Sequence, residues 1–306
     1  MFGAINIVYG TTLLFIGFQT MDETTPAVAS TNPLAKHFRQ PSIYFKLPSG
    51  GQYWPKGSLD LPPNGEIGVM SMTTKDEITL KTPDALLNGQ GVVDVIHSCC
   101  PAVKDAWKMP SIDVDAALIA IRIASYGNQM DFSAKCPHCT QTNEYAIDLG
   151  KSLISITPPD YTIPLSVDGL KIRVHPQPYF SMNKTNMIAF EEQQIMRSLA
   201  GLEDNPEEAK AKFDLHIAKV IELNIALLAN STKSIETESG DLVTDPDHIT
   251  EFYNNADNRI IKKVQGYLAE LNEKAAIKPV DITCLTEECK KEFPVNITFD
   301  YASFFA

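Results

Sequence analysis

Cys136-Pro137-His138-Cys139 is the stretch around which this chain is organised, because a second close pair of cysteines, Cys284 and Cys289, lies far downstream. Four cysteine thiolates are the ligand set of a closed tetrahedral zinc site. The two pairs also share their local sequence. Each follows a short apolar approach and precedes an alternating strand, and a glutamate, Glu144 or Glu292, stands eight positions after the first cysteine of its pair. We therefore predict a split zinc ribbon, made of two β-hairpin knuckles and interrupted by an inserted domain.

Other chemistries of paired cysteines remain open at this point. Cys-Pro-His-Cys is also typical of thiol-disulfide oxidoreductases, in which the start of a helix makes the first thiolate acidic. Here residues 140–143 are Thr-Gln-Thr-Asn, poor helix formers that lead into a strand, so the required helix is not expected. A structural disulfide and simple buried thiols are the remaining alternatives. Six cysteines in 306 residues are far fewer than the dense framework of small secreted domains.

The expected ligands are Cys136, Cys139, Cys284 and Cys289, and the expected ion is a structural zinc. Iron is a second option, because tetrahedral sulfur sites accept both ions. The spacer of four residues between Cys284 and Cys289 is longer than the usual two-residue knuckle. We interpret His138, inside the first knuckle, as a solvent-facing turn residue. Cys99 and Cys100, which follow an apolar helical pattern, are interpreted as small buried hydrophobic residues.

The composition is that of an acidic globular chain, with 44% hydrophobic residues and a formal net charge of −12. A chain of this length can bury a sizeable core in one large or two modest domains. The acidic balance argues against sequence-independent binding of nucleic acid, which depends on Lys and Arg to neutralise phosphates. Reduced, paired cysteines fit a cytoplasmic compartment better than a secreted one.

The apolar periods and turn signals predict an α+β fold in four parts. Residues 1–40 are a flexible N-terminal extension and arm, and residues 41–128 a β-hairpin plus two-helix region. Residues 129–150 and 279–306 form the split ribbon, and residues 151–278 an inserted hairpin and helical domain. The first twenty residues carry no charge and lack the basic region of a signal peptide. We interpret them as upstream translation or an unstructured extension, with a membrane anchor as the alternative.

The N-terminal region is expected to open with a hairpin in which residues 43–47 pair with residues 52–54. A helix from Thr82 to Cys99 and a buried helix that starts at Asp113 and ends before Gly127 follow. The residues alone do not separate a core role from a docking role for the aromatic side chains of the hairpin, and we adopt docking as the hypothesis. These side chains are Tyr44, Phe45, Tyr53 and Trp54.

The insertion begins with a second hairpin, in which an Asp-Gly turn joins residues 161–165 to residues 170–175. Helices are predicted over residues 184–199, 206–230, 246–254 and 257–274, with a small hairpin at residues 235–243. Asn205 and Glu208 are expected to cap the second of these helices. Apolar residues at helical spacing predict its inward face: Phe213, Ile217, Val220, Ile221, Leu227 and Leu228.

Three segments carry a family resemblance: TKDEITLKTPDALLNG at residues 74–89, the knuckle at Cys136, and VHPQPY at residues 174–179. They are similar to the baseplate hub subunit family of T4-type contractile-tailed bacteriophages, and the likeness covers most of the chain from about Pro41 onward. The resemblance implies a protein of the central hub of the tail baseplate, or a factor that helps to build it in the host cytoplasm. Its partners would be other baseplate and hub proteins, and self-association within the baseplate is a further option.

The sequence contains no strand-linked Gly-rich phosphate loop, no His-Glu-x-x-His and no Gly-x-Ser-x-Gly. We interpret His175, between Val174 and Pro176, as a structural residue at the end of a strand. We therefore expect a non-enzymatic interaction protein that takes no small-molecule substrate and binds neither nucleic acid nor membrane. Two other classes remain: a zinc-ribbon nucleic-acid binder, which the acidic balance disfavours, and a thiol oxidoreductase, which the strand after Cys139 disfavours.

Overall fold

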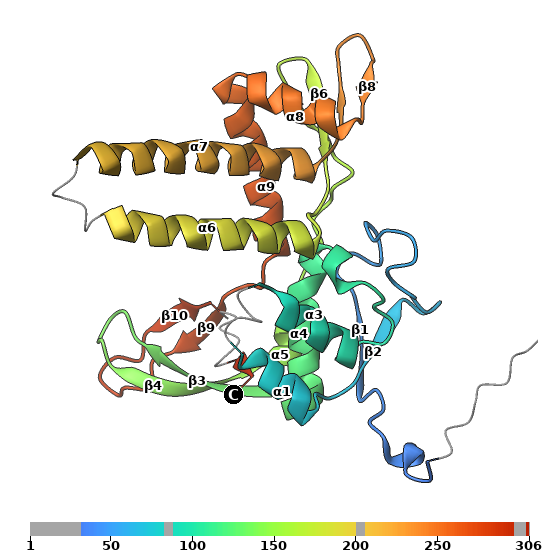
Figure 1. The fold of residues 1–306 in the computed structure, drawn as a ribbon. Coiled ribbons are helices and arrows are strands. Elements are labelled where there is room, and N and C mark those ends of the chain that lie inside the picture. The colour runs from blue at the N-terminus through green and yellow to red at the C-terminus, as the bar shows by residue number, and fades with distance from the viewer. Residues whose placement is uncertain (1–31, 83–87, 200–205, 297–303, 306) are drawn as a thin grey trace, which may run out of the picture. The chain divides into compact units, whose positions relative to one another are not determined.

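The computed structural model of the chain describes residues 32–82, 88–199, 206–296 and 304–305 (Figure 1). It divides the chain into two units, residues 1–38 and 39–306. In the first unit the described part holds a short 3-10 helix, η1 (Ala35–His37). The extension expected over residues 1–31 lies outside the described residues. Among the helices that the structure describes, none is both long and apolar enough to cross a membrane.

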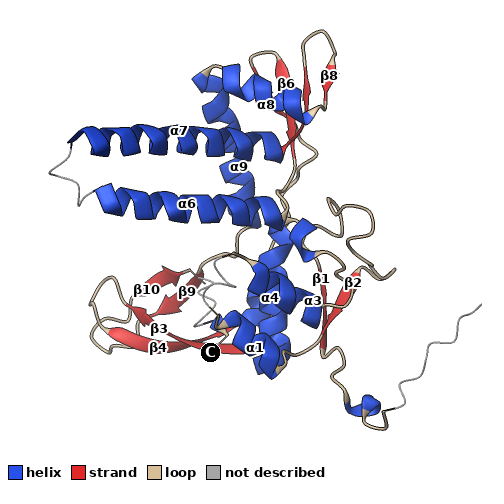
Figure 2. Cartoon of the chain, in the orientation of Figure 1, coloured by secondary structure: helices blue, strands red, loops and turns tan. Residues whose placement is uncertain are grey.

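The N-terminal part of the second unit, which we call the body, surrounds one buried helix (Figure 2). Strand β1 (Ile43–Lys46) pairs antiparallel with β2 (Glu66–Val69). The central helix, α4 (Ser111–Tyr126), is buried on nearly every side, as its continuous apolar run predicts, and ends at Gly127. Around it lie α1 (Thr74–Leu80), α3 (Gln90–Cys99), the 3-10 helix η2 (Ala106–Lys108) and α5 (Leu149–Ser155).

Two antiparallel hairpins follow the predicted ribbon pattern. Strand β3 (Gln129–Lys135) pairs with β4 (Thr142–Asp148), and β9 (Val280–Thr283) pairs with β10 (Glu292–Val295). Between them the insertion forms a four-stranded antiparallel sheet in chain order: β5 (Leu165–Val167), β6 (Leu170–Val174), β7 (Thr232–Glu236) and β8 (Leu242–Val243). Its helices are α6 (Tyr179–Leu199), α7 (Pro206–Ser231), α8 (Pro246–Asn255) and α9 (Asn258–Ala275).

The turn of the second hairpin confirms the prediction from sequence. Asp168 and Gly169 both have positive φ, 46° and 79°, as the primed two-residue turns require. The helices of the insertion also lie where they were expected, with Asp245 and Asp257 as side-chain caps of α8 and α9. Asn205 and its expected cap lie outside the described residues, as does the side chain of Glu208.

The first predicted hairpin is wrong. Strand β1 pairs with β2, so that Phe45 faces Ile67, and residues 52–54 do not form its partner strand. The reason is local backbone geometry, because Gly50, Gly51 and Tyr53 all have positive φ, a conformation that belongs to turns and not to strands. The aromatic side chains therefore do not form one docking surface. Phe45 is buried and Trp54 half-buried against the body core, while Tyr44 and Tyr53 are exposed.

Two helix starts in the body also differ from the prediction. Helix α3 begins at Gln90, because Gly89 has a φ of 76° and interrupts a helix from Thr82. Residues 83–87 lie outside the description. Upstream, α1 was not expected, although Thr73 and Asp76 form a reciprocal capping box at its start. Helix α4 begins at Ser111, and Asp113 is a buried hydrogen-bond acceptor in its first turn.

Among the residues that the structure describes, buried side chains gather in three clusters, one in the body, one in the insertion and one between the two ribbon hairpins. The body cluster also contains Phe304 and Phe305, from the segment that was assigned to the ribbon by sequence. The division into four parts stays a prediction. The clusters nevertheless place the ribbon hairpins on a small core of their own, at the end of which the cysteines lie.

Candidate metal centre

The four predicted cysteines lie together at one end of the two hairpins. Their sulfur atoms are all within 4.8 Å of one another. The closest pairs cross between the hairpins: Cys139 Sγ is 3.6 Å from Cys284 Sγ, and Cys136 Sγ is 3.8 Å from Cys289 Sγ. Sulfurs bound to zinc at about 2.3 Å in a tetrahedron stand about 3.8 Å apart. The spacing in this structure therefore fits a single four-coordinate ion.

The two knuckles are equivalent in their backbone as well as in sequence. The residue after the second cysteine has positive φ in both, 64° at Thr140 and 48° at Lys290. In each knuckle the N–H of the first cysteine donates 2.9 Å to the carbonyl two residues after the second, at Gln141 and at Lys291. In the longer knuckle, the carbonyl of Thr286 accepts the N–H groups of both Cys289 and Lys290. This turn absorbs the two additional residues of the second spacer.

Aromatic packing holds the hairpins against each other below the sulfurs. The ring of Tyr145 on β4 lies 5.8 Å from Phe132 on β3 and 6.2 Å from Phe293 on β10, centroid to centroid. Cys136 and Cys284 are fully buried at the end of this cluster, and Cys139 and Cys289 are half-buried. The alternating pattern of the strands predicted an inward face, but the sequence carried no sign of which residues would meet across the hairpins.

The thiols influence one another strongly. Hydrogen bonding with Thr286 lowers the pKa of Cys284 to about 6. The backbone of Lys291 pulls the pKa of Cys289 down, but burial and hydrogen bonds with the three neighbouring thiols raise it to about 11. Ionisation of Cys284 is thus favoured, and ionisation of Cys289 is opposed. Four thiolates at this distance need a cation to hold them together, which is what a bound metal ion supplies.

Two residues beside the four cysteines contact the cluster without having been predicted. The amide of Asn143 lies 3.7 Å from Cys284 Sγ and 3.4 Å from the hydroxyl of Thr286. Such groups around a metal site orient its ligands. His138 is exposed in the turn, as expected. The segment after Cys139 is strand β4, so the thiolate does not stand at a helix start, as in an oxidoreductase.

The other two cysteines take no part in the cluster. Cys99 and Cys100 are fully buried in the body core, and burial raises the pKa of both thiols, that of Cys99 to about 11. This confirms the prediction that they act as small hydrophobic residues. All six cysteines are free thiols in this structure.

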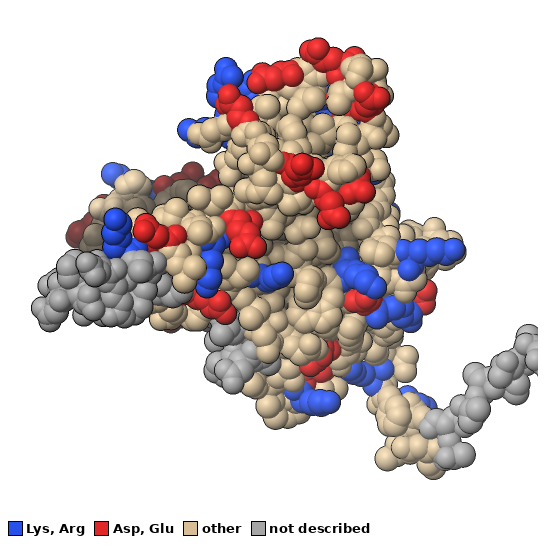
Figure 3. Space-filling view, turned by 45° about the horizontal axis from the view of Figure 1, so that its top comes forward, with Lys and Arg blue, Asp and Glu red and all other residues tan. Residues whose placement is uncertain are grey.

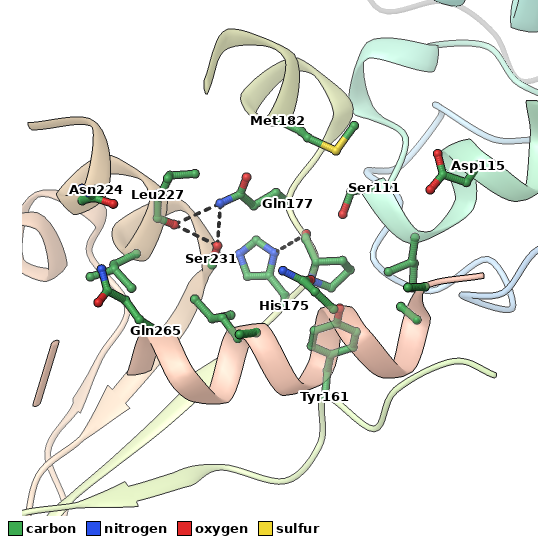
Figure 4. Close-up of a pocket in the computed structure, with 18 residues that line it drawn as sticks. Ser111, Asp115, Tyr161, His175, Gln177, Met182, Asn224, Leu227, Ser231 and Gln265 are labelled. Carbon is green, nitrogen blue, oxygen red and sulfur yellow. Dashed lines mark hydrogen bonds between the residues drawn. The ribbon is translucent and has the colours of Figure 1, made fainter. Parts of the chain in front are cut away.

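A cleft of about 420 Å³ lies between the start of α4 and helices α7 and α9 (Figure 4). His175 follows β6 directly, and its Nδ1 lies 2.9 Å from the Pro176 carbonyl. The amide of Gln177 donates to the hydroxyl of Ser231 at 2.7 Å and to the carbonyl of Leu227 at 3.1 Å. The two Gln177 bonds join the segment after β6 to helix α7, whereas the His175 ring contacts only the next residue in the chain. His175 thus stands at the end of a strand, as predicted, and its structural role stays an interpretation.

On the face shown in Figure 3, acidic and basic side chains are interspersed, and acidic ones are frequent over the insertion at the top of the view. A groove that tracks nucleic-acid phosphates is instead lined by basic residues. The surface charge thus agrees with the acidic composition of the chain.

A family model described as T4 bacteriophage base plate protein matches residues 40–306. Neither the curated proteins nor the solved structures include a match to the chain. The matched range takes in the body, the insertion and both cysteine knuckles, and it includes all three segments on which the resemblance rested. The chain therefore belongs to the T4 bacteriophage base plate protein family.

Proposed function

We propose that this protein is a structural or assembly component of the central hub of a phage tail baseplate, and that its four clustered cysteines hold a structural zinc ion. The family match over residues 40–306 supports a role in the baseplate. The resemblance of residues 74–89 and 174–179 supports the hub as its place there. The protein acts by docking onto other tail proteins and catalyses no reaction. It is assembled in the host cytoplasm and located in the tail baseplate of the virion.

The spacing of the sulfurs carries the zinc proposal. Cys136 and Cys289 are separated by 153 positions in sequence, yet their sulfurs are 3.8 Å apart. A cluster of four thiols at tetrahedral spacing, on two backbone turns of the same form, is the arrangement of a closed structural site. In this role the ion would join the two hairpins, whose shared core is small. It would have no open position for a substrate.

Metal analysis of protein purified without added zinc tests the site. We expect about one zinc ion per chain, and we expect a chelator to lower the melting temperature. Cys139→Ser and Cys289→Ser are expected to lose the ion, whereas Cys99→Ala, which removes a sulfur from the body core, keeps it. Iron in place of zinc would leave the ligands as proposed and change the ion. Metal-free protein with four freely titrating thiols would end the proposal.

The hub assignment has a separate test. Tail-assembly intermediates purified from cells that make an affinity-tagged chain are fractionated, and the chain is quantified in each fraction. We expect it to co-fractionate with central hub intermediates in a fixed ratio. Its presence only in peripheral baseplate fractions, or only as free protein, would contradict a hub role while leaving family membership untouched.

A further inference from the structure

The outer part of helix α7 exposes side chains that its sequence pattern predicts to be buried, and the outer part of α6 beside it is exposed as well. We call residues 184–199 of α6 and 206–227 of α7 the arm. The two helices lie side by side in it (Figure 1). None of the arm side chains that the structure describes is buried. At the base, by contrast, Tyr179, Asn183 and Leu228 are buried. A pair of helices without buried side chains has little to stabilise it in water.

One side of the arm is strongly apolar. Phe213, Ile217 and Ile221 follow one another at four-residue spacing on α7 and are 44%, 41% and 54% exposed. Phe190 on α6 is 42% exposed and borders a groove of about 750 Å³ between the two helices, which His216 and Val220 line from α7. The ring of Phe213 lies 6.5 Å from that of His216, at the edge of this groove. We call Phe190, Phe213, Ile217 and Ile221 the apolar face. The three residues of α7 belong to the stripe predicted to point inward, and that part of the prediction is wrong for the single chain.

We propose that the apolar face binds the same face of a second copy of this chain, so that two arms form an antiparallel four-helix bundle. The face carries both halves of a self-complementary contact. Phe213, Ile217 and Ile221 form a ridge along α7, and the groove beside them, which Phe190 borders, can receive such a ridge. A two-fold axis through the face places each ridge in the groove of the other copy.

The charge of the arm favours a second copy over an oppositely charged partner. The whole chain carries a formal charge of −12, which makes two copies repel each other. Helix α6 carries two acidic and two basic residues, and α7 carries four acidic and three basic residues. The two helices are thus almost neutral in an acidic chain. They form a surface on which two copies can meet with little repulsion.

The arm is also large enough for a stable contact. Its 22 residues of α7 span about 33 Å, and two adjacent helices are about 20 Å wide. A face of these dimensions approaches the roughly 800 Å² per partner that specific interfaces bury. The inference rests on the exposed side chains of the arm. It depends neither on a metal at the cysteines nor on a place in the hub.

The mass of the full-length, metal-loaded protein in solution tests the proposal. We expect sedimentation equilibrium to show that the protein has become a dimer by a concentration of about 100 µM. Ile217→Glu is expected to weaken the dimer at least about 100-fold, because it buries a charge in the contact. Leu215→Glu is the matched control. Leu215 is 60% exposed on the same helix, but it points about 160° away from Ile217.

Circular dichroism and metal content must be unchanged in both variants, so that a monomer reflects a lost contact and not a lost fold. Ile217→Cys treated with a short bis-maleimide should give covalent dimers, and Leu215→Cys should not. A monomeric wild-type protein at the highest concentration would overturn the proposal and leave the face to a different baseplate protein. A dimer that survives Ile217→Glu, or that Leu215→Glu disrupts equally, would also overturn it.

Discussion

At the scale of single residues, Asp113 has the most consequence outside the cysteine cluster. It is fully buried, and its carboxylate accepts hydrogen bonds from the Ser49 N–H at 2.8 Å, the Ser49 hydroxyl at 2.5 Å and Trp54 Nε1 at 2.8 Å. It thereby fastens the turn after β1 to helix α4. From sequence, Asp113 was a helix-start signal. Its partners stand 59 and 64 positions away, so no local pattern could reveal them.

Burial of this carboxylate makes folding stability depend on pH. Burial raises the pKa of Asp113 from its usual 3.8 to about 6, although the hydrogen bonds from Ser49 and Trp54 oppose the shift. Because the folded pKa is the higher one, the unfolded state loses its proton first as the pH rises. The contribution of Asp113 to the free energy of unfolding is therefore fully present below about pH 4. It falls by about 3 kcal/mol as the pH rises to about 6.

Asp113→Asn removes the titration. We expect the advantage of the wild type over this variant, measured by urea unfolding, to shrink by about 3 kcal/mol between about pH 4 and pH 7. A metal ion held by the cysteines would be lost in acid from both proteins alike, so that its loss cancels in the comparison. Parallel pH profiles for the wild type and Asp113→Asn would show that the buried carboxylate does not titrate in this range.

At the scale of elements, local signals predicted what local interactions decide. The Asp168-Gly169 turn, the Gly127 stop of α4 and the helices of the insertion follow from backbone preferences and apolar spacing. The predicted partner of strand β1 was wrong because the true partner, β2, begins 20 positions after β1. The nearer segment that was predicted instead is held in turns. The four cysteines were found because their chemistry is rare. Asn143 and Thr286 beside them are common residues and gave no signal.

The start of α3 provides a test at this scale. Gly89 has a φ of 76°, and a Cβ placed on it would lie 2.6 Å from Cγ of Asn183, the buried residue whose amide donates to the Asn88 carbonyl. Gly89→Ala should cost about 2 kcal/mol or more, because left-handed backbone alone costs an L-residue about 1–2 kcal/mol. Thermal and urea unfolding measure the loss.

The same substitution at another glycine should change the stability of the protein in the opposite direction. Gly266 lies within helix α9 with open space around it. Gly266→Ala should therefore stabilise the protein by about 0.5–1 kcal/mol, since alanine loses less freedom in a helix. Equal effects at Gly89 and Gly266 would mean that neither backbone conformation nor packing at α3 is as described.

At the scale of the whole molecule, the body core joins residues from the two ends of its sequence. Phe304 and Phe305 are buried beside α4, where Arg122 Nε donates 2.9 Å to the Phe304 carbonyl. Arg122 is itself buried and lies over the ring of Tyr126, 4.5 Å from its centroid. The prediction from sequence assigned these two phenylalanines to the ribbon, because they follow its second hairpin in the chain. Only the long-range contact with α4 places them in the body.

Phe304→Ala should destabilise the protein by about 3–5 kcal/mol, the usual cost of removing a fully buried phenylalanine. The backbone carbonyl that binds Arg122 remains in this variant, so the loss reports side-chain packing. Leu285→Ala, at a position that is 56% exposed, should change stability by less than about 0.5 kcal/mol. Denaturant unfolding compares the two. A small effect at Phe304 would remove this residue from the core.

The two cysteine hairpins lie far apart in the sequence, and this separation has a consequence for the order of folding. Cys139 and Cys284 are 145 positions apart, so the hairpins must find each other across a very long loop, which is slow and entropically costly. The insertion lies within that loop, and once it is folded the loop is shorter. The ribbon is thus expected to close last. Until it does, Cys136 and Cys284 are not yet in the buried positions that they have in the folded cluster, and the rate of closure determines how long their thiols are exposed to oxidation.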